Sequence, residues 1–218
     1  MRIVGGTFSG RRIIAAKGDI SRPTTDRTRE ALFNVLAHRD DVVFDGARII
    51  DLFAGSGALG LEAISRGAAF CLFVETDAAA RGAIRDNVEA LALFGSTRIH
   101  RRSATNLGHK PAGLGAPFTL AFLDPPYERA LAIPTLETLR DGGWLEVGAL
   151  VIVEQSIRET PVSTDGYKEV DRRIYGDTQI GIYRLAAKPS KHSITPGKPR
   201  KTMTAAPIIA LVRPSRLR

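Results

Sequence analysis

The alternation of short apolar runs with amphipathic stretches is the feature that most constrains the fold. Apolar runs of strand length occur at residues 49–53, 70–75, 118–123 and 150–153. Between them, apolar residues recur at helical spacing, as in the segment that follows Asp77. Strands that alternate with helices predict parallel βαβ units. We therefore expect an α/β fold: a Rossmann-like, mostly parallel sheet with helices on both faces.

Weaker patterns predict the remaining elements. A small hairpin is expected from residues 2–4 and 12–14, which are separated by glycine-containing turns. Thr25 or Asp26 can cap a following helix. Residues 97–100 read as a weaker strand, 131–139 as a helix, and 173–175 and 179–184 as two late strands.

The formal charge of +8 is unevenly spread along the chain. Residues 1–29 carry two Asp and seven basic side chains, namely Arg2, Arg11, Arg12, Lys17, Arg22, Arg27 and Arg29. Residues 186–218 carry eight Lys or Arg, no Asp or Glu, and five of the 12 prolines. We expect a basic hairpin arm over 1–21, a catalytic domain over 22–185, and a basic Pro-rich tail over 186–218 that is disordered.

The basic arm allows two interpretations. The seven Lys and Arg side chains of residues 1–29, four of them in the arm, could neutralise phosphates, which makes them candidate RNA contacts. A solvated surface hairpin would carry the same charges. Charge alone leaves RNA, DNA and an acidic protein open as partners.

Several classes of protein are disfavoured by composition. No apolar run approaches the roughly 18–20 residues that a membrane span needs, and the N-terminus lacks a signal-peptide core. Cys71 is the single cysteine, so no internal disulfide framework is expected. The four histidines lack metal-ligand spacing, so we expect no metal site. A cytoplasmic monomer without membrane contact is the simplest expectation.

Polar residues follow the predicted strands at their carboxyl ends. Asp51, Glu75, Ser103 and Asp124 each lie at or just after such an end. In a doubly wound sheet, ligands bind where these ends and their loops cluster. The sequence therefore predicts one crevice that is lined by all four residues.

The glycine run after Asp51 suits two kinds of cofactor. Gly55-x-Gly57-x-x-Gly60 matches the dinucleotide fingerprint, and Glu75 could bond ribose hydroxyls in either case, so a nicotinamide-dependent reductase is a rival. Asp51, however, would face a pyrophosphate with like charge. The same carboxylate suits S-adenosylmethionine, which carries an ammonium and a sulfonium, and the helix N-terminus can receive its carboxylate.

The segment Asp124-Pro125-Pro126-Tyr127 is a sharper signal for chemistry. Consecutive prolines fix the backbone and remove two amide donors. A carboxylate and a carbonyl held in this way can accept both hydrogens of an exocyclic amino group, and so aim its lone pair at a methyl donor. Tyr127 offers a flat face for a base that has left its stack.

These motifs resemble those of the class I amino-group methyltransferases. The opening Arg2–Ile13, the segment Arg22–Asn34 and the late Tyr175-Gly-Asp-Thr178 further resemble the bacterial RsmD family, over about residues 1–185. That resemblance implies a seven-stranded sheet, S-adenosylmethionine as methyl donor, and a guanine exocyclic amino group in small-subunit ribosomal RNA, free or in an assembling particle, as target.

The resemblance also implies a set of site residues. Asp124, Pro125, Pro126 and Tyr127 would hold the target base. The cofactor pocket would be lined by Thr24, Phe33, Asp51, Phe53, Gly55, Ser56, Gly57, Glu75, Thr76, Ser103, Ala104 and Asp124. Many class I enzymes have an Asp after the third strand, where this chain has Arg102-Ser103-Ala104.

Other functions compete with this one. A DNA adenine methyltransferase shares the Asp-Pro-Pro-Tyr motif, although no insertion large enough to read a DNA sequence is visible. A non-catalytic RNA-binding module would use the arm and leave Asp124 without a role.

Overall fold

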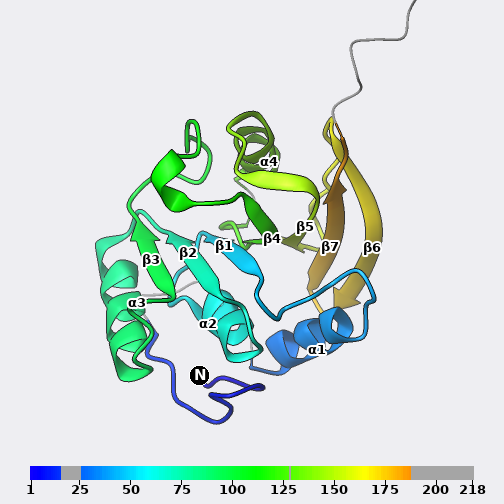
Figure 1. The fold of residues 1–218 in the computed structure, drawn as a ribbon. Coiled ribbons are helices and arrows are strands. Elements are labelled where there is room, and N and C mark those ends of the chain that lie inside the picture. Colours follow the sequence, from blue (N-terminus) through cyan, green and yellow to red (C-terminus); the bar gives the residue numbers. More distant parts are fainter. Residues whose placement is uncertain (16–25, 128, 188–218) are drawn as a thin grey trace, which may run out of the picture. The chain divides into compact units, whose positions relative to one another are not determined.

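A computed structural model describes residues 1–15, 26–127 and 129–187 (Figure 1). The predictions for Thr24, Thr25, Lys17, Arg22 and nearly all of the tail fall outside these residues. Among the described residues, no helix is long and apolar enough to cross a membrane.

The helices and strands follow the predicted order. The helices are α1 (Asp26–Ala37), α2 (Ala58–Ser65), α3 (Ala78–Ala90), the short η1 (Ala112–Leu114) and α4 (Ala132–Asp141). The strands are β1 (Arg48–Leu52), β2 (Phe70–Val74), β3 (Thr97–His100), β4 (Phe118–Leu123), β5 (Leu145–Ser156), β6 (Tyr167–Tyr175) and β7 (Thr178–Leu185).

The strands form one seven-stranded sheet in the order β3-β2-β1-β4-β5-β7-β6. The five strands from β3 to β5 are parallel, whereas β7 pairs antiparallel with both β5 and β6. The predicted mostly parallel α/β sheet is therefore confirmed. The order reverses direction between β1 and β4, which is where a doubly wound sheet opens a crevice for ligands.

Local signals explain several element boundaries. Asp77 caps α3, since its side chain accepts a hydrogen bond from the Ala80 amide at 2.7 Å. The strand predicted at residues 150–153 is longer than expected, because β5 continues through polar residues to Ser156. Glu154, Gln155 and Ser156 are buried there, and the Gln179 side chain donates to the Ser156 carbonyl at 2.9 Å. Pairing with β7 therefore extends the strand beyond its apolar segment.

The alternation of side chains along each strand divides the core into two layers. Ile49, Phe73 and Phe122 pack on the face that is covered by α1, α2, α3 and the N-terminal arm. Ile50, Leu72 and Leu123 pack on the other face with residues of α4. Figure 1 shows these helices on opposite sides of the sheet.

The N-terminal arm (residues 1–15) is the predicted hairpin, and it packs closely on the rest of the chain. Arg2 and Arg12 form an antiparallel bridge, while Ile3 and Ile13 are buried in the core. The Asn87 side chain of α3 binds both the amide and the carbonyl of Ile14, at 2.8 and 3.0 Å. The arm is thereby fixed along α3.

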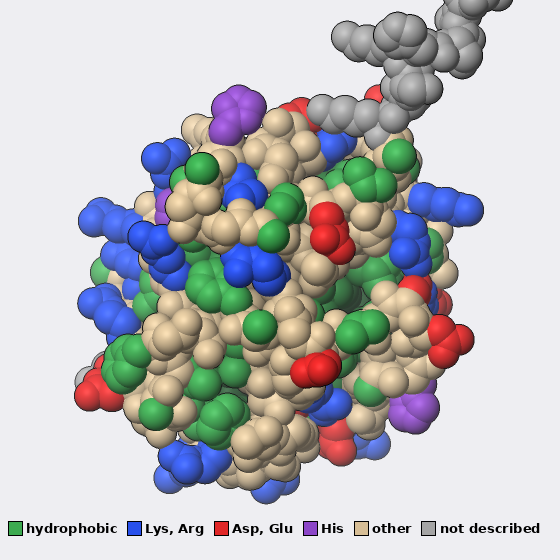
Figure 2. Space-filling view, viewed as in Figure 1, with side chains coloured by type: hydrophobic (Ala, Val, Ile, Leu, Met, Phe, Trp, Pro, Cys, Tyr) green, Lys and Arg blue, Asp and Glu red, His purple; other side chains and the backbone are tan. Residues whose placement is uncertain are grey.

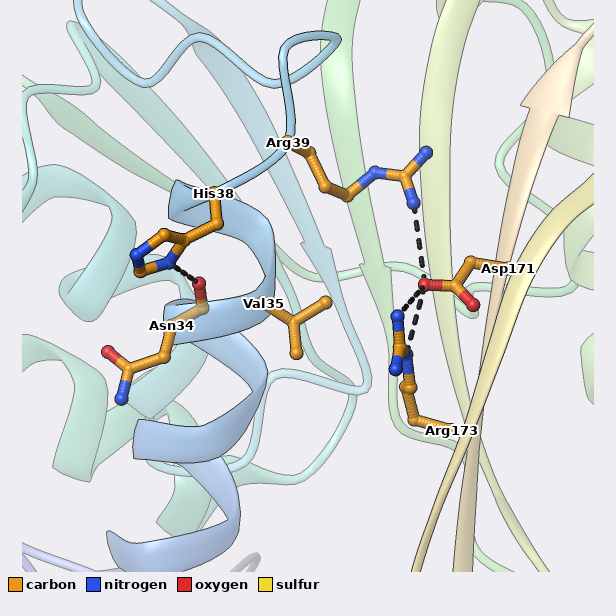
Figure 3. Close-up of a pocket in the computed structure, with 6 residues that line it drawn as sticks. All are labelled: Asn34, Val35, His38, Arg39, Asp171 and Arg173. Atoms are coloured by element: carbon orange, nitrogen blue, oxygen red, sulfur yellow. Dashed lines mark hydrogen bonds and ion pairs between the residues drawn. The ribbon is translucent and has the colours of Figure 1, made fainter.

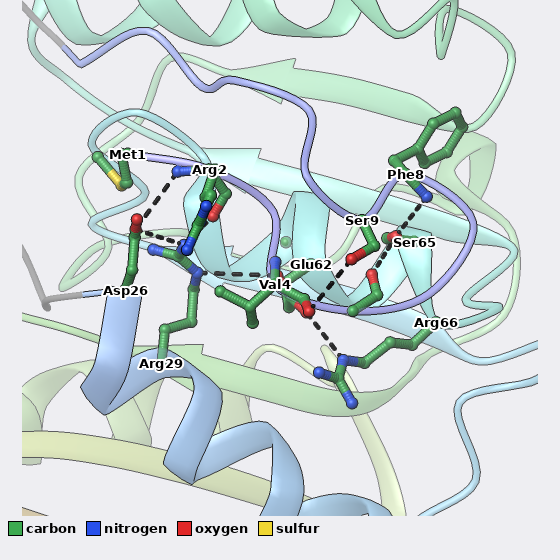
Figure 4. Close-up of polar contacts among 12 residues, drawn as sticks. Met1, Arg2, Val4, Phe8, Ser9, Asp26, Arg29, Glu62, Ser65 and Arg66 are labelled. Atoms are coloured by element: carbon green, nitrogen blue, oxygen red, sulfur yellow. Dashed lines mark hydrogen bonds and ion pairs between the residues drawn. The ribbon is translucent and has the colours of Figure 1, made fainter.

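A buried ionic network joins the arm to α1 and α2 (Figure 4). Arg29 is fully buried and pairs with Asp26 at 2.8 Å and Glu62 at 3.8 Å. Glu62, also fully buried, accepts from the Val4 amide at 2.8 Å and pairs with Arg66 at 2.9 Å. The prediction that Arg29 contacts RNA is therefore wrong, because its guanidinium serves this internal network.

Removal of the Glu62 carboxylate should destabilise the fold strongly. Glu62→Ala leaves the Arg29 charge buried with one fewer carboxylate, a change that costs about 3–5 kcal/mol in comparable sites. The control Glu89→Ala, on the exposed face of α3, should change the free energy of unfolding by less than about 0.5 kcal/mol. Urea unfolding measures both, and Glu62→Gln provides a milder variant. Equal losses for Glu62→Ala and Glu89→Ala would contradict this role.

Candidate functional site

The strand register brings the predicted polar residues to one edge of the sheet. Leu52 at the end of β1 pairs with Val74 of β2 and with Leu123 of β4, and Val74 pairs with His100 of β3. The residues that follow these positions therefore emerge side by side. Glu75 and Asp124 continue the alternation of Phe73 and Phe122, which is the sheet face on which Asp51 also lies.

The loop between β1 and α2 has a left-handed backbone at three positions. The φ angles are 58° at Phe53, 54° at Gly55 and 80° at Gly57. The left-handed conformation is sterically unfavourable for Phe53, which has a Cβ atom. Backbone strain of this kind is concentrated at functional sites. A Cβ atom at Gly55 would meet no atom within 4 Å, so open space adjoins the backbone there. The loop thus exposes main chain in front of the N-terminus of α2.

Asp51 lies beneath this loop. Its side chain is 1% exposed, and its Oδ2 atom accepts a hydrogen bond from the Gly60 amide at 2.9 Å. Burial raises the pKa of Asp51 to about 8; the Gly60 bond opposes this rise and the charge of Glu75 adds to it. Asp51 therefore does not present the open carboxylate that was expected to face the ligand: it lies beneath the loop and binds the first turn of α2.

Glu75 holds the other end of the loop. Its Oε2 atom accepts from the Gly55 amide at 2.9 Å, and its Oε1 atom accepts from the Asp77 amide at 2.8 Å. Each carboxylate oxygen can accept more than one hydrogen bond, so both keep capacity for a ligand. The side chain is partly exposed, as contact with a ligand requires.

The Asp124–Tyr127 segment follows β4 next to the glycine loop. The Asp124 amide lies 3.5 Å from the Leu52 carbonyl, which ties the segment to the end of β1. Asp124 is partly exposed, Pro125 is buried and Pro126 is exposed. A rigid backbone that offers a carboxylate and carbonyls, but no amide donors at the two prolines, can accept hydrogens from an amino group.

Tyr127 is anchored by two residues that sequence reasoning did not assign to the site. Its hydroxyl donates to Glu154 Oε1 at 3.1 Å and lies 3.2 Å from Thr178 Oγ1. Burial raises the pKa of Tyr127 to about 12, so the hydroxyl stays neutral near pH 7. The side chain is 37% exposed, which leaves part of the ring open. Thr178 belongs to the Tyr175–Thr178 segment. The resemblance of that segment to the RsmD family is the sequence signal that could have pointed to Thr178 as a site residue.

The other predicted cofactor residues lie around the same edge with differing exposure. Thr76 and Ser103 are exposed, while Ser56 and Ala104 are buried. Ser103 Oγ lies 2.8 Å from Thr105 Oγ1, so the residue in place of the usual Asp is already in a local hydrogen bond.

Some predicted residues are not brought to this edge. Phe33 is fully buried, with ring centroids 5.7 Å from Phe44 and 5.5 Å from Phe122, and it offers no surface to a ligand. Arg2, Arg11, Arg12 and Arg27 are exposed, so their side chains are accessible to a partner.

A hollow of about 370 Å³ lies elsewhere, between α1 and the edge strand β6 (Figure 3). Asp171 there pairs with Arg39 at 3.4 Å and Arg173 at 3.0 Å. Three strands separate β6 from β1, so this hollow is distinct from the glycine-loop edge. Within the described part of the chain, no group of His, Cys, Asp and Glu has the arrangement of a metal site.

Comparison with known proteins identifies the family. Residues 1–184 match the family described as "Conserved hypothetical protein 95". The chain is 40% identical over 189 residues to "Ribosomal RNA small subunit methyltransferase D" of Escherichia coli, covering 86% of this chain and 91% of that protein. The protein of the same name from Haemophilus influenzae is 28% identical over 185 residues, covering 84% and 93%.

Solved structures show the same fold. The Escherichia coli protein yhhF superposes with a TM-score of 0.71 and 34% identity, covering 86% of this chain and 99% of that one. An rRNA methylase from Streptococcus thermophilus, 14% identical with a TM-score of 0.54, covers 72% and 95% and shares the fold alone. The chain therefore belongs to the RsmD family of class I methyltransferases, as its motifs had indicated.

Proposed function

We propose that this methyltransferase transfers a methyl group from S-adenosylmethionine to the exocyclic N2 amino group of a guanine in small-subunit ribosomal RNA. The observation that carries the proposal is the position of Asp124-Pro125-Pro126-Tyr127 beside the glycine loop, at the switch point between β1 and β4. The RNA substrate is supported by the relatives from Escherichia coli and Haemophilus influenzae, which are named as ribosomal RNA small subunit methyltransferases.

The residues around the glycine loop fit the proposed methyl donor. Open space next to Gly55 admits a ligand close to the backbone, and Glu75 has acceptor capacity for two ribose hydroxyls. The N-terminus of α2 favours a carboxylate, while the acidic groups Asp51 and Glu75 favour a cation. A pyrophosphate at this loop would be repelled by Glu75 and by the buried Asp51 in its ionised form, which disfavours a nicotinamide dinucleotide. When bound, the donor supplies an electrophilic methyl group on a positively charged sulfur.

The Asp124–Tyr127 segment would orient the nucleophile. The Asp124 carboxylate and the Pro125 carbonyl accept the two amino hydrogens, which draws the nitrogen lone pair out of conjugation with the ring. Asp124 or water would take one of the amino protons as the nitrogen gains the methyl carbon, whose bond to the donor sulfur breaks with the electron pair left on sulfur. Tyr127 stays neutral and supports the base by stacking, since Glu154 and Thr178 hold its hydroxyl.

The product of the reaction tests this proposal directly. We expect N2-methylguanosine in small-subunit ribosomal RNA that lacks the modification, presented both free and assembled with its proteins. Mass spectrometry of the nucleosides after incubation with S-adenosylmethionine identifies the product. Methyladenine in DNA, with RNA unmodified, would instead establish the DNA-modifying alternative.

Asp124 should matter for the reaction more than for substrate binding. Asp124→Ala removes the side-chain acceptor of an amino hydrogen, and we expect methyl transfer to fall about 100-fold or more while RNA affinity changes by less than about 3-fold. The exposed control Asp165→Ala should leave both unchanged. Single-turnover transfer and RNA binding measure the two effects. Full transfer by Asp124→Ala would reject the clamp.

The buried Asp51 predicts a pH dependence of cofactor binding. A cationic ligand favours the ionised carboxylate, whose pKa of about 8 leaves it mostly protonated at pH 6.5. Affinity for S-adenosylmethionine should therefore rise about 10-fold between pH 6.5 and 8.5 in the wild type, relative to Asp51→Asn. Calorimetry at three pH values measures this ratio, and parallel profiles would contradict the role of Asp51.

The same shift makes a prediction for stability without ligand. A raised pKa in the folded state stabilises the fold at low pH, and that stabilisation is lost as pH rises through about 8. The free energy of unfolding should fall more steeply between pH 6.5 and 8.5 in the wild type than in Asp51→Asn. Urea unfolding across this range provides the comparison.

A further inference from the structure

The arginine side chains differ in the partners that they have. Among the described residues, seven arginines make ion pairs with carboxylates, and they lie on or next to α1, α2, α4, β6 and β7: Arg29, Arg39, Arg66, Arg140, Arg172, Arg173 and Arg184. In the part of the chain that the structure describes, no ion pair involves Arg98, Arg101 or Arg102. All three are exposed on β3 or directly after it. Their charges are therefore available to an outside partner.

The sequence around β3 has no acidic residue to offset these charges. Between Glu89 and Asp124 the chain contains four Lys or Arg and no Asp or Glu. Burial, and the nearby positive charges of Arg102 and Arg98, hold the pKa of His100 below its ordinary value. The guanidinium groups of Arg98 and Arg102 therefore both lie close enough to His100 to affect its ring.

The position of β3 makes this region a surface. β3 is one of the two edge strands of the sheet and has β2 as its single neighbour. In Figure 2, Lys and Arg side chains gather on the left of the view, where Figure 1 places β3 and α3. Asp86 and Glu89 are exposed on α3 itself, so the excess of positive charge is centred on the strand and the loop after it.

The surface links the arm to the candidate site. At one end, Arg11 of the arm donates from Nη2 to the Ala90 carbonyl at 2.9 Å, at the end of α3. At the other end, the Glu75 amide donates to the His100 carbonyl at 3.2 Å, so Arg101 follows directly beside the glycine-loop edge. A continuous strip of backbone therefore runs from the arm, past β3, to the edge where the cofactor would lie.

We propose that Arg98, Arg101 and Arg102 bind the phosphates of the RNA next to the target base, as an extension of the arm surface formed by Arg11 and Arg12. The inference rests on the proposed function, because the partner is the RNA substrate. Three strand spacings separate β3 from β4, about 14 Å in all. Phosphates along one strand of double-stranded DNA are about 3.4 Å apart on the helix axis, and with a spacing of this order RNA held at Asp124 reaches β3 within a few nucleotides.

A charged edge strand also discourages edge-to-edge pairing with another copy of the chain. Prevention of such pairing would require the positive charges of Arg98, Arg101 and Arg102, but no contact with RNA. It predicts self-association when the charges are removed, with unchanged RNA affinity, which the following experiment separates from phosphate binding.

The test compares two triple variants, each of which removes three positive charges: one from the proposed RNA surface at β3, the other from a distant surface at β6. The variant Arg98→Gln/Arg101→Gln/Arg102→Gln is compared with the control Arg158→Gln/Lys168→Gln/Arg173→Gln, which removes the same charge from exposed positions on β6 and the loop after β5. Binding of small-subunit ribosomal RNA, free and assembled with its proteins, is measured from 50 to 300 mM salt. S-adenosylhomocysteine calorimetry and thermal unfolding verify the fold and the cofactor site of each variant.

Loss of three phosphate contacts should lower RNA affinity on the order of 100-fold at 0.1 M salt and reduce the salt slope by roughly 2 to 3. The control should bind within about 3-fold of the wild type with an unchanged slope. Equal binding by both variants, with the wild type active on RNA, overturns the proposed surface and leaves the proposed function standing. A wild type that neither binds nor methylates RNA overturns both. Equal loss in both variants overturns the surface, since only net charge then matters.

Discussion

Two carboxylates hold the turn between β1 and α2 in the conformation on which the site depends. Asp51 binds the Gly60 amide from within the core, and Glu75 binds the Gly55 amide from the end of the neighbouring strand. These bonds keep the loop open in front of the α2 N-terminus and compensate the left-handed backbone at Phe53. A Cβ atom at Gly60 would lie 2.4 Å from the Phe73 ring and 2.5 Å from Cys71 Sγ, so helix and sheet approach closely only with glycine there.

Much of the fold could be predicted from sequence, because local signals and tertiary packing agree. The apolar runs at β1, β2 and β4 and the Asp77 cap are read from neighbouring residues alone. The convergence of Glu75 and Asp124 with Asp51 also follows, since the ends of parallel strands share one edge. The length of β5 was underestimated, because its last three residues are polar and become buried only through pairing with β7.

The errors concern residues whose environment is set by distant parts of the chain. Arg29 reads as one more exposed arginine in a basic segment, yet Glu62, 33 positions later, makes it an internal residue. Phe33 lies in a motif shared with the family but is enclosed by Phe44 and Phe122. Conversely, the run without acidic residues around Arg98, Arg101 and Arg102 is visible in the sequence, but their grouping is not. These arginines lie together, exposed and without ion pairs in the described structure, on or just after the edge strand β3, which only the arrangement in space reveals.

The central claim is that one ligand lies between the glycine loop and the Asp124 segment. A crystal structure with bound S-adenosylhomocysteine tests it most directly. We predict that the ligand contacts the backbone at Gly55, that its ribose hydroxyls bond to Glu75, and that its sulfur points towards Asp124. A ligand bound in the hollow between α1 and β6, or a loop that closes over Gly55 and excludes the ligand, would contradict it.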